Sequence, residues 1–322
     1  MRRWSPTTRC LACSPATRQL RRYCSQRTAA VYHHSQDFDW DELRKRAPVD
    51  PFSASSPKIP PDGATQELLW ESSYKTHAEQ SSHLFKERRY LLQAFPSLSS
   101  GELQVLEVGC GNGSSTTPIL SGNPNARVHA TDPSETAVEI TRAVCENLGV
   151  ADRLTTEVQS ADGPLGGALH GHFDAALLVF TLSAVPRPGD VALFNRVASA
   201  LRPGGVLLFR DYGNYDLRML RDVASASGAP QTKSKPPGSE AHQKKADALT
   251  STRVGEREFI RPGGYFRRYY ALEDLHDLVA SAGVRLAVEE LRYLCVRVAN
   301  ARRGLSMDRV FCHGVLRREE DR

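Results

Sequence analysis

Short apolar runs alternate with amphipathic stretches through the middle of this chain. Five apolar runs have the composition of buried strands: 104–108, 126–132, 154–158, 173–185 and 206–209. Between them, residues 136–148 and 190–201 repeat apolar side chains at helical spacing, and 273–282 does so later. Strands that are apolar on both faces and alternate with helices form parallel sheets covered on both sides. The pattern therefore predicts an α/β fold, to which the apolar stretches 288–298 and 309–316 add a terminal strand pair.

Two segments differ from this alternation. Residues 65–95 contain no proline or glycine and repeat apolar residues at roughly helical spacing, which predicts an N-terminal extension of helices over the sheet edge. Residues 228–253 are polar, basic and interrupted by proline, which predicts a disordered insert. Contact of its lysines with RNA is the alternative role for this insert.

The N-terminus has an unusual composition. Residues 1–36 contain seven arginines and several serines and threonines but no acidic residue, which is typical of a mitochondrial or plastid transit peptide. A disordered basic arm that touches RNA is the alternative. Residues 37–64 become proline-rich and are predicted to form a linker that lies across the domain. The domain itself is then expected to span 65–322.

Composition adds a few limits. A length of 322 residues suits one elaborated domain, and a net charge of +5 permits an anionic partner without requiring one. No apolar run approaches the roughly 20 residues of a membrane span, so no membrane partner is expected. The seven cysteines lack regular spacing, and Cys10 and Cys13 have no second pair at zinc-site spacing. Free thiols and no metal site are therefore expected.

The candidate chemistry begins where the first apolar run ends. Glycines follow at alternate positions in the pattern Glu107-x-Gly109-x-Gly111-x-Gly113, which predicts a tight turn that lets a ligand approach the backbone. Dinucleotide-binding folds need a different spacing, Gly-x-Gly-x-x-Gly. Asp132 ends the next predicted strand. A turn that only connects strand to helix is the weaker alternative.

This pattern resembles class I S-adenosylmethionine (SAM) methyltransferases. The resemblance implies a Rossmann-like fold with a mixed seven-stranded sheet, helices on both faces, and SAM as the cofactor. It also implies that the bare turn at Gly109 and Gly111 accommodates the amino-acid and sulfonium portion, and that Asp132 binds the ribose hydroxyls. Further cofactor contacts are implied for Asp162 with its neighbour Gly163, and for Val179 beside the base. A solvated loop acid is the alternative for Asp162, and plain core packing is the alternative for Val179.

Two stretches resemble one family within that class, the methyltransferase-like enzymes that make 3-methylcytidine in tRNA anticodon loops. One is Leu208-Phe-Arg-Asp-Tyr-Gly-Asn-Tyr-Asp216 followed by Met219-Leu-Arg221; the other is Trp70-x-x-x-Tyr74-Lys75 followed by Phe85-Lys-Glu-Arg88. The resemblance covers roughly residues 66–317, interrupted by the insert. It implies that Trp70 and Tyr74 close over the cofactor, with ordinary core packing as the alternative.

The resemblance also implies an RNA-binding set: Phe85, Lys86, Arg88, Arg261 and Arg267. The last two belong to the stretch 259–270, where basic and aromatic residues are interleaved as nucleic-acid surfaces require. This stretch departs from the family, because Gly263-Gly264-Tyr265-Phe266 stands where the family has Asp-Gly-Thr-Arg. The family's arginine has no direct counterpart here, and Arg267 is the nearest substitute.

Arg210, Asp211 and Tyr212 are the predicted catalytic residues, because their strand is expected to end beside the cofactor's methyl group. The N3 atom of cytosine has an in-plane lone pair, so methylation requires in-line placement and stabilisation of the resulting cation rather than a strong base. Asp211 is expected to accept a hydrogen bond from the exocyclic amine, Arg210 to hold a phosphate or orient Asp211, and Tyr212 to stack on the base. An Arg-Asp pair that only secures the strand end is the alternative.

The sequence therefore predicts a SAM-dependent tRNA (cytidine-N3) methyltransferase. A mitochondrial location is expected, with plastid or cytoplasm as alternatives. tRNA is the expected partner, and the need for an aminoacyl-tRNA synthetase or another accessory protein stays open. The competing functions are a protein or small-molecule methyltransferase, and a non-catalytic SAM-fold subunit that holds RNA or a partner.

Overall fold

The structure is a computed structural model that describes residues 36–47, 60–80, 85–160, 163, 169–227, 250–300 and 305–320. Every described residue belongs to one compact unit. The predicted transit peptide up to residue 35, Asp162 and residues 228–249 of the predicted insert lie outside the described residues.

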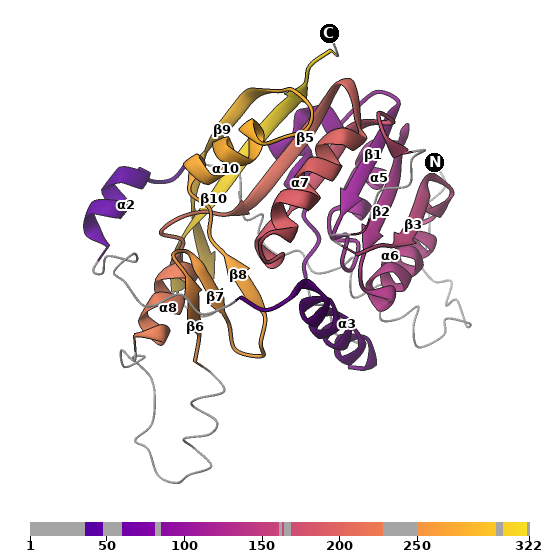
Figure 1. Cartoon of the computed structure of the whole chain (residues 1–322). Helices are drawn as coiled ribbons and strands as arrows, with labels where there is room; N and C mark the ends of the chain where they lie inside the picture. Colours follow the sequence, from indigo (N-terminus) through magenta and orange to yellow (C-terminus); the bar gives the residue numbers. More distant parts are fainter. Residues whose placement is uncertain are drawn as a thin grey trace, which may run out of the picture. The chain divides into compact units, whose positions relative to one another are not determined.

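Among the described residues, seven strands form one mixed sheet in the order β3-β2-β1-β4-β5-β10-β9 (Figure 1). The strands are β1 Leu103–Val108, β2 Ala126–Asp132, β3 Leu154–Val158, β4 Phe173–Val179, β5 Leu201–Tyr212, β9 Leu286–Asn300 and β10 Leu305–Arg318. Strands β1 to β5 are parallel, whereas β10 runs antiparallel to both β5 and β9. The predicted mixed seven-stranded sheet is confirmed.

Helices cover both faces of this sheet, as the doubly apolar strands predicted. In the described part of the chain the helices are α2 Trp40–Arg46, α3 Gly63–Glu79, α4 Leu91–Ala94, α5 Thr116–Gly122, α6 Glu135–Leu148, α7 Gly189–Ala200, α8 Leu217–Ala226 and α10 Leu272–Ala280. Successive strand residues point to opposite faces. Leu106 of β1 accordingly joins the hydrophobic cluster with α7 and α10, and Val105 joins the cluster with α4 and α5.

The segment before the sheet begins with a helix inside the predicted linker. Asp39 caps α2 by accepting a hydrogen bond from the backbone N–H of Glu42. Trp40 stacks on Tyr293 of β9 with ring centroids 4.5 Å apart, and the backbone N–H of Asp37 donates to Cys295 of the same strand. Residues 37–64 were predicted as a linker that lies across the domain, but part of this stretch forms helix α2, and the Trp40 indole packs on an aromatic partner in the sheet.

A second, smaller sheet lies beyond α8 in the chain. Its strands β6 Thr252–Gly255, β7 Glu258–Ile260 and β8 Phe266–Arg268 pair in that order, antiparallel. Ser251 is buried just before β6 and donates from Oγ to Asp222 of α8 at 2.7 Å. The prediction of disorder up to residue 253 is therefore wrong for the last residues of the insert.

No helix of the described residues has the length and hydropathy needed to cross a bilayer.

Candidate functional site

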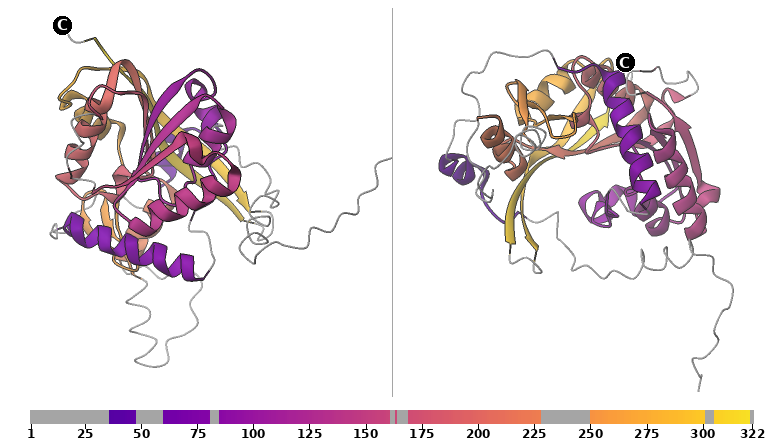
Figure 2. Two further views of the ribbon diagram at one scale, coloured as in Figure 1. Left: turned by 90° about the vertical axis from the view of Figure 1, so that its right-hand side faces the viewer. Right: turned by 90° about the horizontal axis from the view of Figure 1, so that it is seen from below.

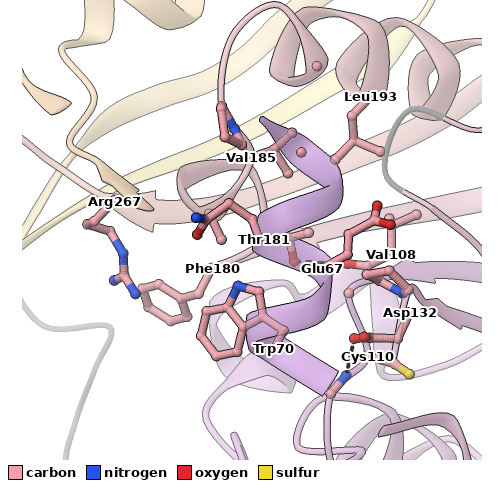
Figure 3. Close-up of a pocket in the computed structure, with 18 of the residues that line it drawn as sticks. Glu67, Trp70, Val108, Cys110, Asp132, Phe180, Thr181, Val185, Leu193 and Arg267 are labelled. Atoms are coloured by element: carbon pink, nitrogen blue, oxygen red, sulfur yellow. Dashed lines mark hydrogen bonds between the residues drawn. The ribbon is translucent and has the colours of Figure 1, made fainter. Parts of the chain in front are cut away.

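A cavity of about 600 Å³ lies at the carboxyl ends of the parallel strands, where folds of this type bind ligands (Figure 3). Several parts of the chain form its wall. Among them are one face of α3, the segment with Phe85 and Arg88, the glycine turn after β1, the acid that ends β2, the turn after β4, the start of α7, and the side chains of Tyr212 and Arg267. Segments that are far apart in the sequence therefore meet around one space.

The glycine turn presents bare backbone to this cavity. Gly109 and Gly111 both have positive φ angles, +74° and +57°, which side-chain-bearing residues rarely adopt. A Cβ at Gly109 would lie 2.6 Å from the Thr181 side chain, and one at Gly111 would lie 2.5 Å from the Tyr74 hydroxyl. Both positions require glycine because of conformation and close packing together, and both line the cavity.

Glu107, the acid that begins the glycine pattern, has a structural role next to this turn. Its side chain is buried and accepts a hydrogen bond from the Thr116 hydroxyl at the start of α5. Burial raises the pKa of Glu107 to about 7. The residue joins β1 to α5 rather than facing the cavity, so its contribution is to the shape of the turn.

Asp132 ends β2 and faces the cavity. Its two oxygens accept from the backbone N–H groups of Gly111 (2.9 Å) and Ser134 (3.0 Å), which orients the carboxyl group. Burial raises the pKa of Asp132 to about 6, against the lowering effect of those two hydrogen bonds. At neutral pH the group is therefore a charged acceptor, which suits a pair of ribose hydroxyls.

Helix α3 closes the cavity with side chains on one face, including Gln66, Trp70 and Tyr74. The helix runs beside α6 (Figure 2), and Glu71 fixes it there by accepting from the hydroxyls of Ser134 (2.5 Å) and Thr136 (2.9 Å). These hydrogen bonds outweigh burial and lower the pKa of Glu71 to about 2. The predicted cofactor-closing pair therefore sits on a helix that is anchored at the N-terminus of α6.

The stretch that departs from the family also holds α3 in place. The Gln66 side chain accepts from the backbone N–H of Phe266 (2.7 Å) and donates to the Gly264 carbonyl (3.1 Å). The Tyr265 ring packs 5.0 Å from that of Trp70. Gly264 has a φ of +88°, and a Cβ there would lie 3.2 Å from Leu69. The sequence Gly263-Gly264-Tyr265-Phe266 thus serves to dock α3 in this chain.

Aromatic rings and arginines line the remaining end of the cavity, which we call the aromatic end: Phe85, Arg88, Phe180, Tyr212 and Arg267. The Arg267 guanidinium lies 4.3 Å from the centre of the Tyr212 ring. The centres of the Phe180 and Tyr212 rings are 4.9 Å apart. Arg88 lies 5.4 Å from the centre of the Phe180 ring. Burial alone would raise the pKa of Tyr212, but Arg267, Arg218 and Arg309 reverse this and lower it.

Arg210 and Asp211 do not line the cavity, so the prediction that they contact the target is wrong. Both side chains are 0% exposed, and as neighbours in β5 they point to opposite faces of the sheet. The Arg210 guanidinium packs between the rings of Tyr90 (4.6 Å) and Phe311 (5.0 Å), and burial lowers its pKa to about 10.

The Asp211 side chain is hydrogen-bonded to the backbone. Its carboxyl group accepts from the backbone N–H groups of Ser183 (2.9 Å) and Tyr212 (2.8 Å), and burial raises its pKa. It therefore joins the turn after β4 to the end of β5. Of the three predicted catalytic residues, only Tyr212 reaches the cavity. Asp211 secures the strand end, as the alternative proposed, but Arg210 packs on the other face of the sheet and does not pair with it.

Three further predicted residues lie away from the cavity wall. Lys86 is exposed, Arg261 lies 3.4 Å from a carboxyl oxygen of Asp222, and the Gly163 carbonyl accepts from Arg196. Val179 does line the cavity. The sequence analysis missed several lining residues: Gln66, Glu67, Phe180 and Thr181. The first two stand four and three residues before Trp70, so helical spacing was the available signal.

Comparison with known proteins agrees with this architecture. A sequence model described as a methyltransferase domain matches residues 106–207. A SAM-dependent methyltransferase from Anabaena variabilis has the same fold, with a TM-score of 0.57 and 16% identity over 83% of this chain and 99% of that chain. The sheet order, the glycine turn and these matches give the chain the fold of the class I SAM-dependent methyltransferases.

Sequence relatives are more specific than the fold. The tRNA N(3)-methylcytidine methyltransferase trm141 of Schizosaccharomyces pombe is 28% identical over 76% of this chain and 90% of its own length. The tRNA N(3)-cytidine methyltransferase METTL2 of Danio rerio is 26% identical over 87% of this chain and 84% of its own length. O-methyltransferase 3 of Dictyostelium discoideum is 27% identical, over 69% of this chain but 45% of its own length. The resemblance to the tRNA N(3)-methylcytidine methyltransferases is therefore confirmed over most of the chain.

Proposed function

We propose that this protein is a SAM-dependent methyltransferase that forms 3-methylcytidine in the anticodon loop of tRNA. The observation that carries the proposal is a single cavity with two chemically different ends. One end has bare backbone and a charged carboxylate, and the other has aromatic rings beside arginines. The similarity to tRNA N(3)-methylcytidine methyltransferases along most of the chain supports the same reaction.

The first end, which we call the cofactor end, includes Gly109, Gly111, Asp132 and Val179. It suits SAM, which supplies an activated methyl group on its sulfonium. Gly109 and Gly111 leave room for its amino-acid portion, since any side chain there would clash. Asp132 offers a charged acceptor to the ribose hydroxyls, and Val179 gives the base an apolar contact. Trp70 and Tyr74 would close over the bound molecule, because α3 holds them in the cavity wall.

The aromatic end suits a nucleotide of single-stranded RNA. Phe180 and Tyr212 present rings on which an unstacked base can pack, and Arg88 and Arg267 bring positive charge for the backbone phosphates. Methylation at N3 leaves a positive charge on the base, which aromatic faces stabilise. No side chain has to remove a proton from N3, which agrees with the burial of Asp211 away from the cavity.

The proposal extends to location and partners. Action in the mitochondrion is supported by the arginine-rich, acid-free composition of residues 1–36. tRNA is the proposed partner, and an aminoacyl-tRNA synthetase or another accessory protein is proposed only as a helper that raises activity. If the purified chain is fully active on tRNA alone, no accessory protein is needed, and that part of the proposal is wrong.

Nucleoside mass spectrometry tests the reaction directly. Organellar and cytosolic tRNA from cells with and without this protein are digested and compared, and selective loss of 3-methylcytidine from organellar tRNA is expected. In parallel, the purified protein is given SAM and tRNA whose target cytidine is intact or replaced by uridine. Unchanged 3-methylcytidine in both pools, without a redundant enzyme, would contradict the substrate.

A methyltransferase that acts on a protein or a small molecule is the second candidate, favoured by the similarity to O-methyltransferase 3. Labelled methyl groups distinguish the two, because product label that is sensitive to ribonuclease belongs to RNA. Label that resists ribonuclease and stays with protein or small molecules would favour this second candidate.

A further inference from the structure

A second carboxylate, Glu67, lies in the cavity wall with Asp132. Glu67 belongs to α3 and precedes Trp70 by three residues and Tyr74 by seven, so the three side chains share one helical face. Figure 3 shows Glu67 on the same side of the cavity as Asp132, away from Arg267 and Phe180. Helix α3 therefore brings an acidic group to the cofactor end and not to the aromatic end.

The position of this carboxylate is well determined by its surroundings. Glu67 accepts a hydrogen bond of 2.5 Å from the hydroxyl of Ser160, which follows β3. Gln66 and Glu71 anchor α3 to Phe266 and Ser134. A carboxylate has about four acceptor positions, so the bond from Ser160 is compatible with a further bond to a ligand.

The charges also favour a ligand at this place. Glu67 lies close enough to Asp132 for its negative charge to raise the pKa of that group. Two carboxylates that converge on one partly enclosed space repel each other unless donors or a positive charge lie between them. The ribose of the cofactor carries two hydroxyl donors, and the sulfonium next to it is positive.

We propose that Glu67 is a second cofactor-binding carboxylate, which accepts a hydrogen bond from a ribose hydroxyl alongside Asp132. The inference rests on the proposed function only in that it takes SAM as the cofactor, and it is independent of the RNA substrate. α3 then recognises the cofactor by a polar contact as well as by covering it with Trp70 and Tyr74.

Calorimetric binding to the full chain without RNA tests this role. The ligands are S-adenosylhomocysteine and its 2′-deoxy and 3′-deoxy analogues, and the variants are Glu67→Gln and Glu71→Gln. Glu67→Gln is expected to bind S-adenosylhomocysteine about tenfold more weakly, as loss of a charged acceptor implies. The loss is expected to shrink to about twofold or less for the analogue that lacks the hydroxyl contacted by Glu67.

Glu71→Gln is the matched control, because Glu71 lies one turn further along α3 and contacts Ser134 and Thr136 rather than lining the cavity. Any loss in this variant is expected to be equal for all three ligands, since it would act through the position of the helix. Thermal melting of each variant reports whether the fold is intact.

Two results would overturn the role of Glu67. The first is wild-type affinity of Glu67→Gln for S-adenosylhomocysteine, and the second is an equal loss for all three ligands. Absence of binding by the wild-type protein would overturn the cofactor itself, together with this role. Hydroxyl-dependent binding through Glu67 combined with no methylation of tRNA would support the inference and reject the proposed function.

Discussion

The two ends of the cavity are built in different ways. The cofactor end consists of backbone in a turn near Gly109, with carboxylates held by hydrogen bonds from backbone N–H groups or a serine hydroxyl. The aromatic end consists of side chains from four separate segments, including Phe180 after β4 and Arg267 in β8, which contact one another through rings and guanidinium groups. The first end depends on local geometry and the second on tertiary packing, so substitutions should separate them.

The largest expected effect is at the glycine turn. Gly111→Ala adds a Cβ at a φ of +57° and 2.5 Å from the Tyr74 hydroxyl, so affinity for S-adenosylhomocysteine is expected to fall at least about 100-fold. Gly101→Ala is the matched control, because Gly101 also has a positive φ but no atom lies within 4 Å of the added Cβ. Calorimetry on both variants checks the result, and equal losses would contradict it.

At the aromatic end, Tyr212→Ala is expected to lower kcat/KM for tRNA by about 10- to 100-fold, the usual value of one stacking contact. Affinity for S-adenosylhomocysteine is expected to stay within about twofold. Tyr212→Phe keeps the ring and is expected to lose less than the alanine variant. Steady-state kinetics and calorimetry are compared on protein with a normal melting transition. A parallel loss of cofactor affinity in Tyr212→Ala would show that the two ends are not separable.

Acid should weaken the cofactor end selectively. The pKa of Asp132 is raised to about 6, and only the charged carboxylate accepts from both ribose hydroxyls, so binding is lost as the pH falls through that value. Between pH 7.5 and 5.5, affinity for S-adenosylhomocysteine is expected to fall about fourfold from this one protonation. Calorimetry across this range checks it, and Asp132→Asn is expected to bind more weakly with a flatter profile.

The smallest effect on binding is expected at Asp211. Asp211→Asn replaces a carboxylate that accepts from two backbone N–H groups, so the free energy of unfolding is expected to fall by about 1–3 kcal/mol. Affinity for S-adenosylhomocysteine and KM for tRNA are expected to stay near the wild-type values. Urea unfolding, calorimetry and kinetics are measured together. A change in KM for tRNA without a loss of stability would contradict this and indicate that Asp211 contacts the target.

Local spacing predicted the glycine turn, the acid that ends β2 and most of the sheet. The glycine pattern and Asp132 were recognisable because a positive φ and a strand end are properties of a few consecutive residues. The same local reasoning placed Tyr212 at the end of its strand, but it treated Arg210 and Asp211 as equivalent neighbours. Their burial depends on Tyr90, Phe311 and Ser183, which come from other parts of the chain.

The sequence by itself determined the class of fold, the glycine turn and the acid beside it, since periodicity and backbone conformation are encoded within a few residues. Only the tertiary structure decided that Gly264 and Phe266 dock α3, that Phe180 joins Tyr212 and Arg267, and that α2 packs on β9. Each of these contacts joins side chains from segments that are distant in sequence. Their formation depends on burial and packing after the sheet has assembled, which no local pattern records.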